Sequence, residues 1–365
     1  MIPARTAAAP TVRAELVPGA RVWPSACRAR IDASAGRVAL AGQGASLPAI
    51  DEGNRSLLLP SLRTELEGRE WMLSIKGAGA RGPAYSGYPR EHGALPPRVI
   101  SGERWNADAP YGGQGESAAL HALSITALAE GCSLGGAMIC PLIGVVEVPP
   151  EHVRSDVRWY RRQRGACVQE QRLVPSDVRL FAGSDVTLGG DTARALDALG
   201  VHGVEAIEAF VERYLASGIA ALTLWARTAR MHESGVWEGL DLDDAWLDKD
   251  SVIAADGTLF LVDLEALEWT PLTHRVGLAE RVTRQLDRNY YELMFALDAV
   301  LDLRDRLRGV EPARSVRCAE IAARAELACA GDPFVRAEDA GDGLDLFVRA
   351  PSGQPEVRVR FVDRR

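Results

Sequence analysis

The sequence changes character near its middle, and this change limits the folds that the chain can adopt. The first half contains short apolar runs separated by Pro and Gly, together with one Ala/Leu-rich stretch. The second half places apolar residues at helical spacing over two long segments, 204–232 and 276–308. Strands followed by helices, rather than a regular alternation of the two, are typical of an α+β protein. We therefore predict an α+β fold with two lobes.

The same patterns predict individual elements. An apolar run that ends at Lys76, and later runs bounded by Pro, have the length of strands. In the second half, Asp256-Gly257 is a typical two-residue turn between two apolar runs. We predict strands over 71–76, 139–148 and part of 165–180, a helix over 116–130, hairpins over 252–264 and 344–362, a long functional loop over 83–115, and short strands and loops over 1–70.

Composition excludes several classes of protein. With 47% hydrophobic and 25% charged residues, the chain can form a core, so a disordered protein is excluded. A net charge of −8 argues against a dedicated nucleic-acid binder, which usually carries a basic excess. Six scattered cysteines, and no apolar run near the ~18 residues of a transmembrane helix, lead us to expect a cytoplasmic protein that does not enter a membrane.

A lysine and two glycines at the end of a predicted strand suggest contact with phosphate. Lys76 closes the apolar run, and Gly77 and Gly79 follow it. A compact cation beside permissive backbone lets both the ammonium group and main-chain amides approach phosphate oxygens. A solvated lysine at the end of a strand is the alternative interpretation.

Carboxylates gather in two places of the second half. Asp263 directly follows the apolar run 259–262, and Asp241, Asp243 and Asp244 lie in a short acidic stretch upstream. Carboxylate oxygens are the ligands that hard cations prefer, and a cation would relieve the repulsion among them. A turn or cap role for Asp263, and a solvated acidic loop, are the alternatives.

The order of these features matches the catalytic region of protein kinases. A helix ending near His232, an acidic loop, a hairpin and Asp263 follow one another as helix, catalytic loop, hairpin and metal-binding Asp do in kinases. Upstream, Lys76 precedes a helix with Glu116 at its start, which matches the Lys–Glu pair that positions nucleotide phosphates.

Three segments carry a more specific resemblance. REWMLSIKGAGARGPAYS at 69–86, SGERWNADAPYGGQGESAALHALSITALAEG at 101–131 and RLVPSDVRLF at 172–181 are similar, in this order, to motifs of the selenoprotein O family. They lie within residues 69–181, a span of about a third of the chain. The resemblance implies a protein-kinase-like fold that binds ATP in an inverted orientation and transfers AMP to protein hydroxyls.

The resemblance also implies roles for single residues. Lys76 and Glu116 would form the phosphate-orienting pair beside Gly77 and Gly79. Arg172 and Arg179 would hold phosphates, because a guanidinium fork suits phosphate oxygens.

In the acidic stretch the match to the family is weaker. Asp263 would bind Mg²⁺, with Glu265 as an extra ligand. The family's catalytic Asp falls on Asp244, but its metal-binding Asn falls on Ala245, which cannot ligate a metal. Asp243 or Asp241 would then replace that ligand, or the site would hold one metal ion, or catalysis would be lost. In an active protein, Asp241 or Asp244 would take the proton of the acceptor.

The predicted organisation has four parts. These are an N-terminal extension (1–70), a kinase-like N-lobe (71–180), a kinase-like C-lobe (181–310) and a C-terminal appendage with a β-hairpin (311–365). The predicted function is transfer of AMP from ATP to a hydroxyl acceptor, a protein or a small molecule, with Mg²⁺ or Mn²⁺. The alternatives are a phosphotransferase and, because of Ala245, a nucleotide-binding pseudokinase or partner-binding module.

Overall fold

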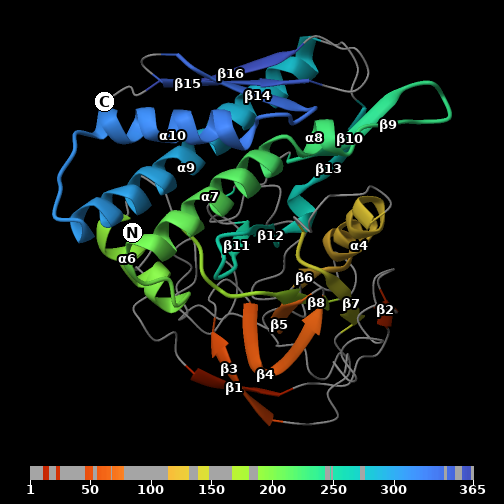
Figure 1. Cartoon of the computed structure of the whole chain (residues 1–365). Helices are drawn as coiled ribbons and strands as arrows, with labels where there is room; N and C mark the ends of the chain where they lie inside the picture. The colour runs from red at the N-terminus through yellow and green to blue at the C-terminus, as the bar shows by residue number, and fades with distance from the viewer. Residues whose placement is uncertain are drawn as a thin grey trace, which may run out of the picture. The chain divides into compact units, whose positions relative to one another are not determined.

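A computed structural model of the chain contains a large antiparallel sheet, a set of helices and several small sheets (Figure 1). The residues described are 11–15, 22–24, 46–51, 56–66, 68–77, 114–130, 139–147, 167–180, 188–242, 247, 250–271, 276–340, 343–349 and 356–362. The predicted mixture of helix and sheet is confirmed, whereas the bilobal kinase-like arrangement and the four-part organisation stay predictions. None of the described helices combines the length and the apolar character needed to cross a bilayer.

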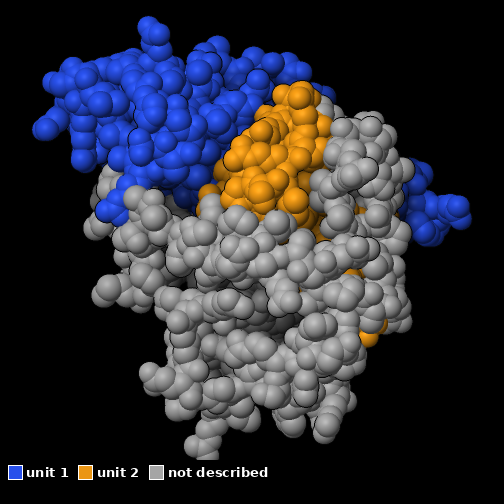
Figure 2. All heavy atoms as spheres, turned by 90° about the horizontal axis from the view of Figure 1, so that it is seen from below, with its two compact units in different colours: residues 1, 131–139, 178–365 blue, residues 2–130, 140–177 orange. Residues whose placement is uncertain are grey.

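The chain forms two compact units, shown in different colours in Figure 2. We call residues 2–130 and 140–177 the sheet unit. We call residue 1 with residues 131–139 and 178–365 the helix unit. Each unit is described by itself below.

The sheet unit is built on one antiparallel sheet. Its strand order is β1-β3-β4-β5-β8-β7-β2, and a further short strand, β6, also pairs with β8. The strands are β1 (Thr11–Glu15), β2 (Val22–Pro24), β3 (Ser46–Asp51), β4 (Ser56–Leu66), β5 (Arg69–Lys76), β6 (Gln114–Gly115), β7 (Leu142–Glu147) and β8 (Cys167–Val174). The predicted strand over 71–76 is confirmed, and the strand predicted from Ile139 begins only at Leu142.

The β4–β5 hairpin supplies much of the sheet's core. Leu73 and Ile75 alternate with polar residues on β5 and are almost fully buried. Gly68 occupies the turn with φ +73°, a conformation that residues with a side chain rarely adopt. The indole Nε1 of Trp71 donates a hydrogen bond to the carbonyl oxygen of Leu66 at 3.2 Å, so this buried polar group is satisfied.

One helix of the sheet unit packs on the sheet. Helix α4 (Glu116–Glu130) has the bounds predicted from its run of Ala and Leu, which are strong helix formers. Its Ala119 is fully buried and packs with Val145 of β7 and Val168 of β8. These contacts fix which face of the sheet the helix covers.

The helix unit contains five described α-helices, coloured from green to blue in Figure 1. They are α6 (Leu188–Ala198), α7 (Gly203–Leu222), α8 (Leu224–Arg227), α9 (Val276–Leu307) and α10 (Arg314–Ala328). Its short strands and one 3-10 helix are β9 (Arg230–Met231), β10 (Trp237–Asp241), β11 (Ser251–Ile253), β12 (Leu259–Leu261), η4 (Leu264–Ala266), β13 (Glu268–Pro271), β14 (Val335–Asp339), β15 (Gly343–Val348) and β16 (Val357–Val362).

Two expectations for this unit are wrong. The helix predicted over 204–232 ends at Leu222, and the short helix α8 carries the chain only to Arg227. The start of the acidic stretch is strand rather than loop, because Trp237–Asp241 pairs with β13. The hairpin at Asp256-Gly257, the helix over 276–308 and the C-terminal hairpin are confirmed.

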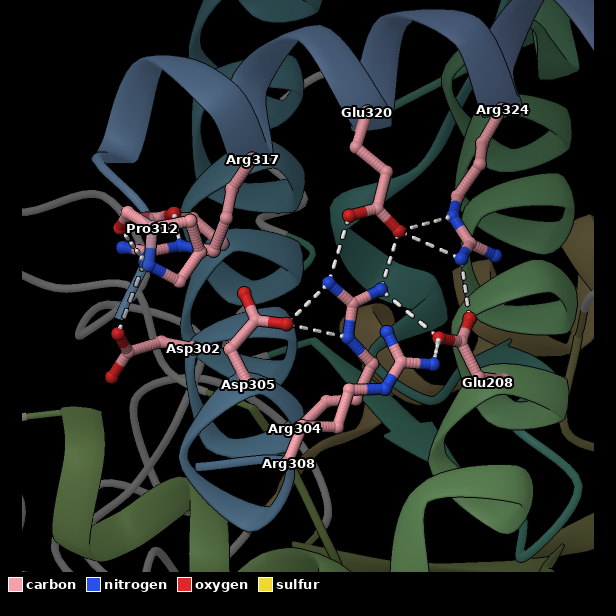
Figure 3. A network of polar contacts seen from close by, with 10 residues as sticks. Glu208, Asp302, Arg304, Asp305, Arg308, Pro312, Arg317, Glu320 and Arg324 are labelled. Atoms are coloured by element: carbon pink, nitrogen blue, oxygen red, sulfur yellow. Dashed lines mark hydrogen bonds and ion pairs between the residues drawn. The ribbon is translucent and has the colours of Figure 1, made fainter. Parts of the chain in front are cut away.

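A network of charged side chains joins three helices of the unit (Figure 3). Arg304 of α9 lies at its centre and is 4% exposed. Its guanidinium donates to Glu208 of α7 at 3.0 Å, to Asp305 of α9 at 2.6 and 2.9 Å, and to both carboxylate oxygens of Glu320 of α10. Arg324 of α10 also bonds to Glu208 and Glu320. The network therefore fixes α10 against α7 and α9.

Candidate functional site

The sheet brings two of the predicted phosphate-binding residues onto one face. Lys76 ends β5 directly opposite Glu170 of β8, and Ser74 lies opposite Arg172. Residues opposite each other in an antiparallel pair, and residues two apart on one strand, project from the same face of a sheet. Lys76, Glu170 and Arg172 therefore share one face.

These three side chains form a buried charged cluster. Glu170 is fully buried, and Lys76 and Arg172 are each 4% exposed. The Nη1 atom of Arg172 lies 3.6 Å from Oε1 of Glu170. Burying a charge costs several kcal/mol unless it is paired, so a sheet would not carry this cluster without compensation. Two cations of this kind on one face are a combination that suits phosphate oxygens.

Helix α4 covers the face that carries this cluster. Val168 lies two residues before Glu170 on β8, so both side chains project from the same face, and Val168 packs with Ala119 of α4. Glu116 lies three residues before Ala119, on the same side of the helix. The structure therefore places half-buried Glu116 at the start of the helix that covers the face from which Lys76 projects.

Strand β6 sets the position at which α4 begins. Gln114 pairs with Val168 and Gly115 with Cys167, immediately before the helix. Since β7 pairs with Val168 along one edge of β8, β6 must lie along the other edge, which is the edge that β5 occupies. Gln114 therefore follows two residues beyond the position of Lys76, roughly 7 Å further along the strand.

The first of the two predicted glycines directly follows the cluster. Gly77 is buried and has φ +89°, so the chain turns away from β5 in a conformation that favours glycine. Gly79 lies outside the described residues.

In the helix unit, the β11–β12 hairpin positions two further predicted residues. Val178 accepts a hydrogen bond from the amide of Ile253 at 3.0 Å, and Nε of Arg179 donates to the carbonyl oxygen of Ser251 at 3.1 Å. Ser251 is paired with Leu261, two residues before Asp263. The structure therefore fixes Arg179 on the hairpin that ends at Asp263.

The remaining described carboxylates lie around η4. Asp263 immediately precedes this 3-10 helix and Glu265 lies within it, and both are half-buried. Asp241 ends β10, is 3% exposed, and is paired with Glu268, the first residue of β13. Asp241 is thus part of a strand, not of the loop expected from the sequence.

Residues 243–246 lie outside the described residues, and with them Asp243 and Asp244. The chain is anchored on both sides of this stretch. The amide of Leu240 donates to Oγ1 of Thr228 at 2.7 Å, and the amide of Leu247 donates to Oδ1 of buried Asn289 at 3.0 Å. Neither anchor was predicted from the sequence.

The carboxylates of the helix unit provide only part of the ligands that a hard cation needs. Among the described residues, no group of three or more potential metal-ligating side chains gathers in one place. Mg²⁺ in nucleotide sites typically uses one or two carboxylates, with waters and substrate phosphates completing its coordination. Asp263, with Glu265 nearby in sequence, fits that smaller requirement.

Sequence reasoning missed Glu170, Asp250 and Asn289. Asp250 is buried, and its carbonyl oxygen accepts a hydrogen bond from Val262. The one available signal was the run Gln169-Glu170-Gln171-Arg172 within a predicted strand, because alternation puts Glu170 and Arg172 on one face. The pairing of Glu170 with Lys76 depends on a strand register that one sequence does not reveal.

Comparisons with known proteins add little to this description. No protein-family model and no curated protein matches the chain. Among solved structures, it is similar to the crystal structure of a Stt7 homolog from Micromonas algae soaked with ATP, at 11% sequence identity and a TM-score of 0.32. The match covers 77% of this chain and 76% of that chain. The family named from the sequence motifs stays a prediction.

Proposed function

We propose that the chain is an ATP-dependent transferase in which Lys76 and Arg172 bind nucleotide phosphates. The observation that carries the proposal is the pair of buried cations on one face of the sheet, followed directly by Gly77 in a left-handed conformation. A lysine supplies a compact charge, and an arginine supplies a planar fork that can bind two phosphate oxygens. Neutral ligands would gain little from two adjacent cations.

Asp263 is the residue that we assign to Mg²⁺ or Mn²⁺. A bound metal ion would supply neutralisation of charge on the phosphates and would favour departure of the leaving group. Asp263 follows β12, whose three residues are all buried, so its position is set by the hairpin. Glu265 and a carboxylate of the acidic stretch are further candidates.

The reaction that we propose is transfer of AMP. An acceptor hydroxyl attacks the α-phosphorus of ATP, the bond from this phosphorus to the bridging oxygen breaks, and pyrophosphate leaves. Asp241 or Asp244 takes the hydroxyl proton. The spacing of Arg172 and Arg179 within the third motif supports this reaction over transfer of the terminal phosphate, and the acceptor remains to be identified.

A nucleotide-binding protein without transferase activity is the second candidate, and Ala245 is the residue that favours it. Such a protein would use the same cations to bind ATP. It would differ from the first candidate only in the fate of the nucleotide.

The test uses ATP labelled separately at the α- and γ-phosphates, with Mg²⁺ or Mn²⁺, and follows label into the protein or into a lysate. Transfer of the α label with release of pyrophosphate is the expected result. Transfer of the γ label alone would replace AMP transfer by phosphoryl transfer. Binding of ATP without transfer would favour the second candidate. The variant Asp263→Asn should abolish transfer, whether the wild-type protein transfers AMP or the γ-phosphate. A wild-type protein that binds no ATP would contradict the proposal.

A further inference from the structure

We propose that Glu170 is a positioning residue that orients Lys76 and Arg172 for phosphate, an inference that rests on the proposed function. Glu170 has no solvent-exposed surface. Its neighbours on the same face are the two cations to which we assign the phosphates. Glu170 would therefore act on the nucleotide only through them.

The register places Glu170 next to both cations on one face of the sheet. It lies directly opposite Lys76, at a cross-strand separation of about 5 Å between Cα atoms. Arg172 lies two residues along the same strand, with its Nη1 atom 3.6 Å from the carboxylate. A carboxylate between two cations limits the conformations of both long side chains. That constraint lowers the conformational entropy that they would lose when they bind phosphate.

The sheet also gives Lys76 a carboxylate neighbour that does not depend on helix α4. Glu116, the predicted partner, is carried by a helix that packs on the sheet through Ala119 and Leu123. Glu170 belongs to β8 itself, which is hydrogen-bonded to β5 along five residue pairs. We therefore expect the orientation of Lys76 to persist when Glu116 is removed.

Two physical effects of Glu170 on phosphate affinity have opposite signs, which makes the inference testable. As a negative charge close to the cations, Glu170 would repel phosphate, so its removal would tighten ATP binding. As a positioning residue, it keeps the cations oriented, so its removal weakens ATP binding. The substitution Glu170→Gln keeps the shape of the side chain and removes only the charge.

We expect Glu170→Gln to weaken ATP binding about tenfold, which corresponds to about 1.4 kcal/mol. The affinity for adenosine, which has no phosphate, should stay unchanged. In a Lys76→Met/Arg172→Met background, Glu170→Gln should change ATP affinity less than twofold, because there are no cations left to orient. Glu65→Gln, on an exposed position of β4 in the same sheet, is the matched control and should have no effect.

Each contrary outcome has a distinct meaning. Unchanged or tighter ATP binding by a folded Glu170→Gln variant would overturn the positioning role and leave the proposed function intact. Equal weakening for ATP and adenosine would show a merely structural role. If Glu170→Gln does not fold, the variant Glu170→Asp is tested instead. It keeps the charge on a shorter side chain and should still weaken the binding of ATP more than the binding of adenosine. No binding of ATP by the wild-type protein would overturn both proposals.

Discussion

Arg304 shows what a buried arginine looks like when its role is structural. A guanidinium has five N–H donors, and the five hydrogen bonds from Arg304 reach Glu208, Asp305 and Glu320. The three carboxylates use all the donors, so none is left for a ligand. The network in Figure 3 is therefore a link between helices rather than an anion site.

Loss of Arg304 should be costly. Arg304→Met leaves the carboxylates of Asp305 and Glu320 without their shared cation, and removing one partner of a buried ion pair costs about 3 kcal/mol. Arg306→Met is the matched control on the same helix, because the Arg306–Asp302 pair is largely exposed and such pairs contribute less than about 1 kcal/mol. Urea unfolding of both variants measures the difference, and similar values for the two would contradict the structural role.

The same network predicts a pH dependence. Hydrogen bonds from Arg304, and then from Arg324, lower the pKa of Glu320 from 4.5 to about 2. Because the folded-state pKa is the lower one, the unfolded chain binds a proton first as pH falls. The stabilisation is thus complete above about pH 4.5 and is lost between there and about pH 2. Glu320→Gln should flatten this part of the curve of unfolding free energy against pH, and an unchanged curve would be the contrary result.

Single residues were the level at which the sequence predicted most about the site. Lys76 could be selected because its charge ends an apolar run, and Arg172 could be selected only through the resemblance of 172–181 to a family motif. Glu170 could not, because its importance comes from the residue opposite it on another strand. Arg304 and Glu320 were missed for a similar reason, since a charge on an amphipathic helix is usually solvated.

At the scale of elements, the β11–β12 hairpin depends on its close approach to α7. The amide of Leu259 donates to Oγ of Ser217 at 3.0 Å, which fastens the second strand of the hairpin to the helix. Gly257 has φ +89°, and a Cβ added there would meet the backbone carbonyl of Phe210 well inside van der Waals distance. The turn therefore needs glycine for its conformation and for its lack of a side chain.

Two glycine substitutions separate these requirements. Gly235→Ala, in a turn with φ +78° and no neighbouring atom near the added Cβ, should cost about 1 kcal/mol for the strained backbone alone. Gly257→Ala adds a clash with backbone and should cost about 3 kcal/mol or more. Thermal unfolding compares the two. Equal costs would mean that the hairpin moves away from α7 without loss.

Helix boundaries show where periodicity stops being informative. Apolar residues continue past Leu222, so the pattern predicted one helix to residue 232. The α7 helix instead ends at Leu222. The next residue, Thr223, donates a hydrogen bond from its hydroxyl to the carbonyl oxygen of Ile219 and accepts one from Nε of Arg227. Hydrophobic spacing reports burial, and burial continues through α8 although the long helix does not. The termini of α4 were predictable because its composition changes at both ends.

For the whole molecule, binding of ATP should stabilise the folded chain. A ligand at a hundred times its dissociation constant adds about 2.7 kcal/mol to the free energy of unfolding. We expect ATP to raise the melting temperature by several degrees and to slow hydrogen exchange of the amides in β5 and β8, whereas adenosine should do less. The variant Lys76→Met should lose most of the shift, and a shift that persists in this variant would place the nucleotide elsewhere.

The pairing of two strands along one edge of β8 has a consequence for the design of shorter chains. Lys76 lies opposite Glu170, the next position faces Gln169, and Gln114 lies opposite Val168. Strands β5 and β6 run in the same direction along β8, but Gly77, with φ +89°, leaves the extended conformation directly after Lys76. Lys76 and Gln114 are therefore two register positions apart on the same neighbouring strand, although 37 residues separate them in the sequence. A shorter chain in which a single extended residue joins Lys76 to Gln114 should form one uninterrupted strand that leads into α4.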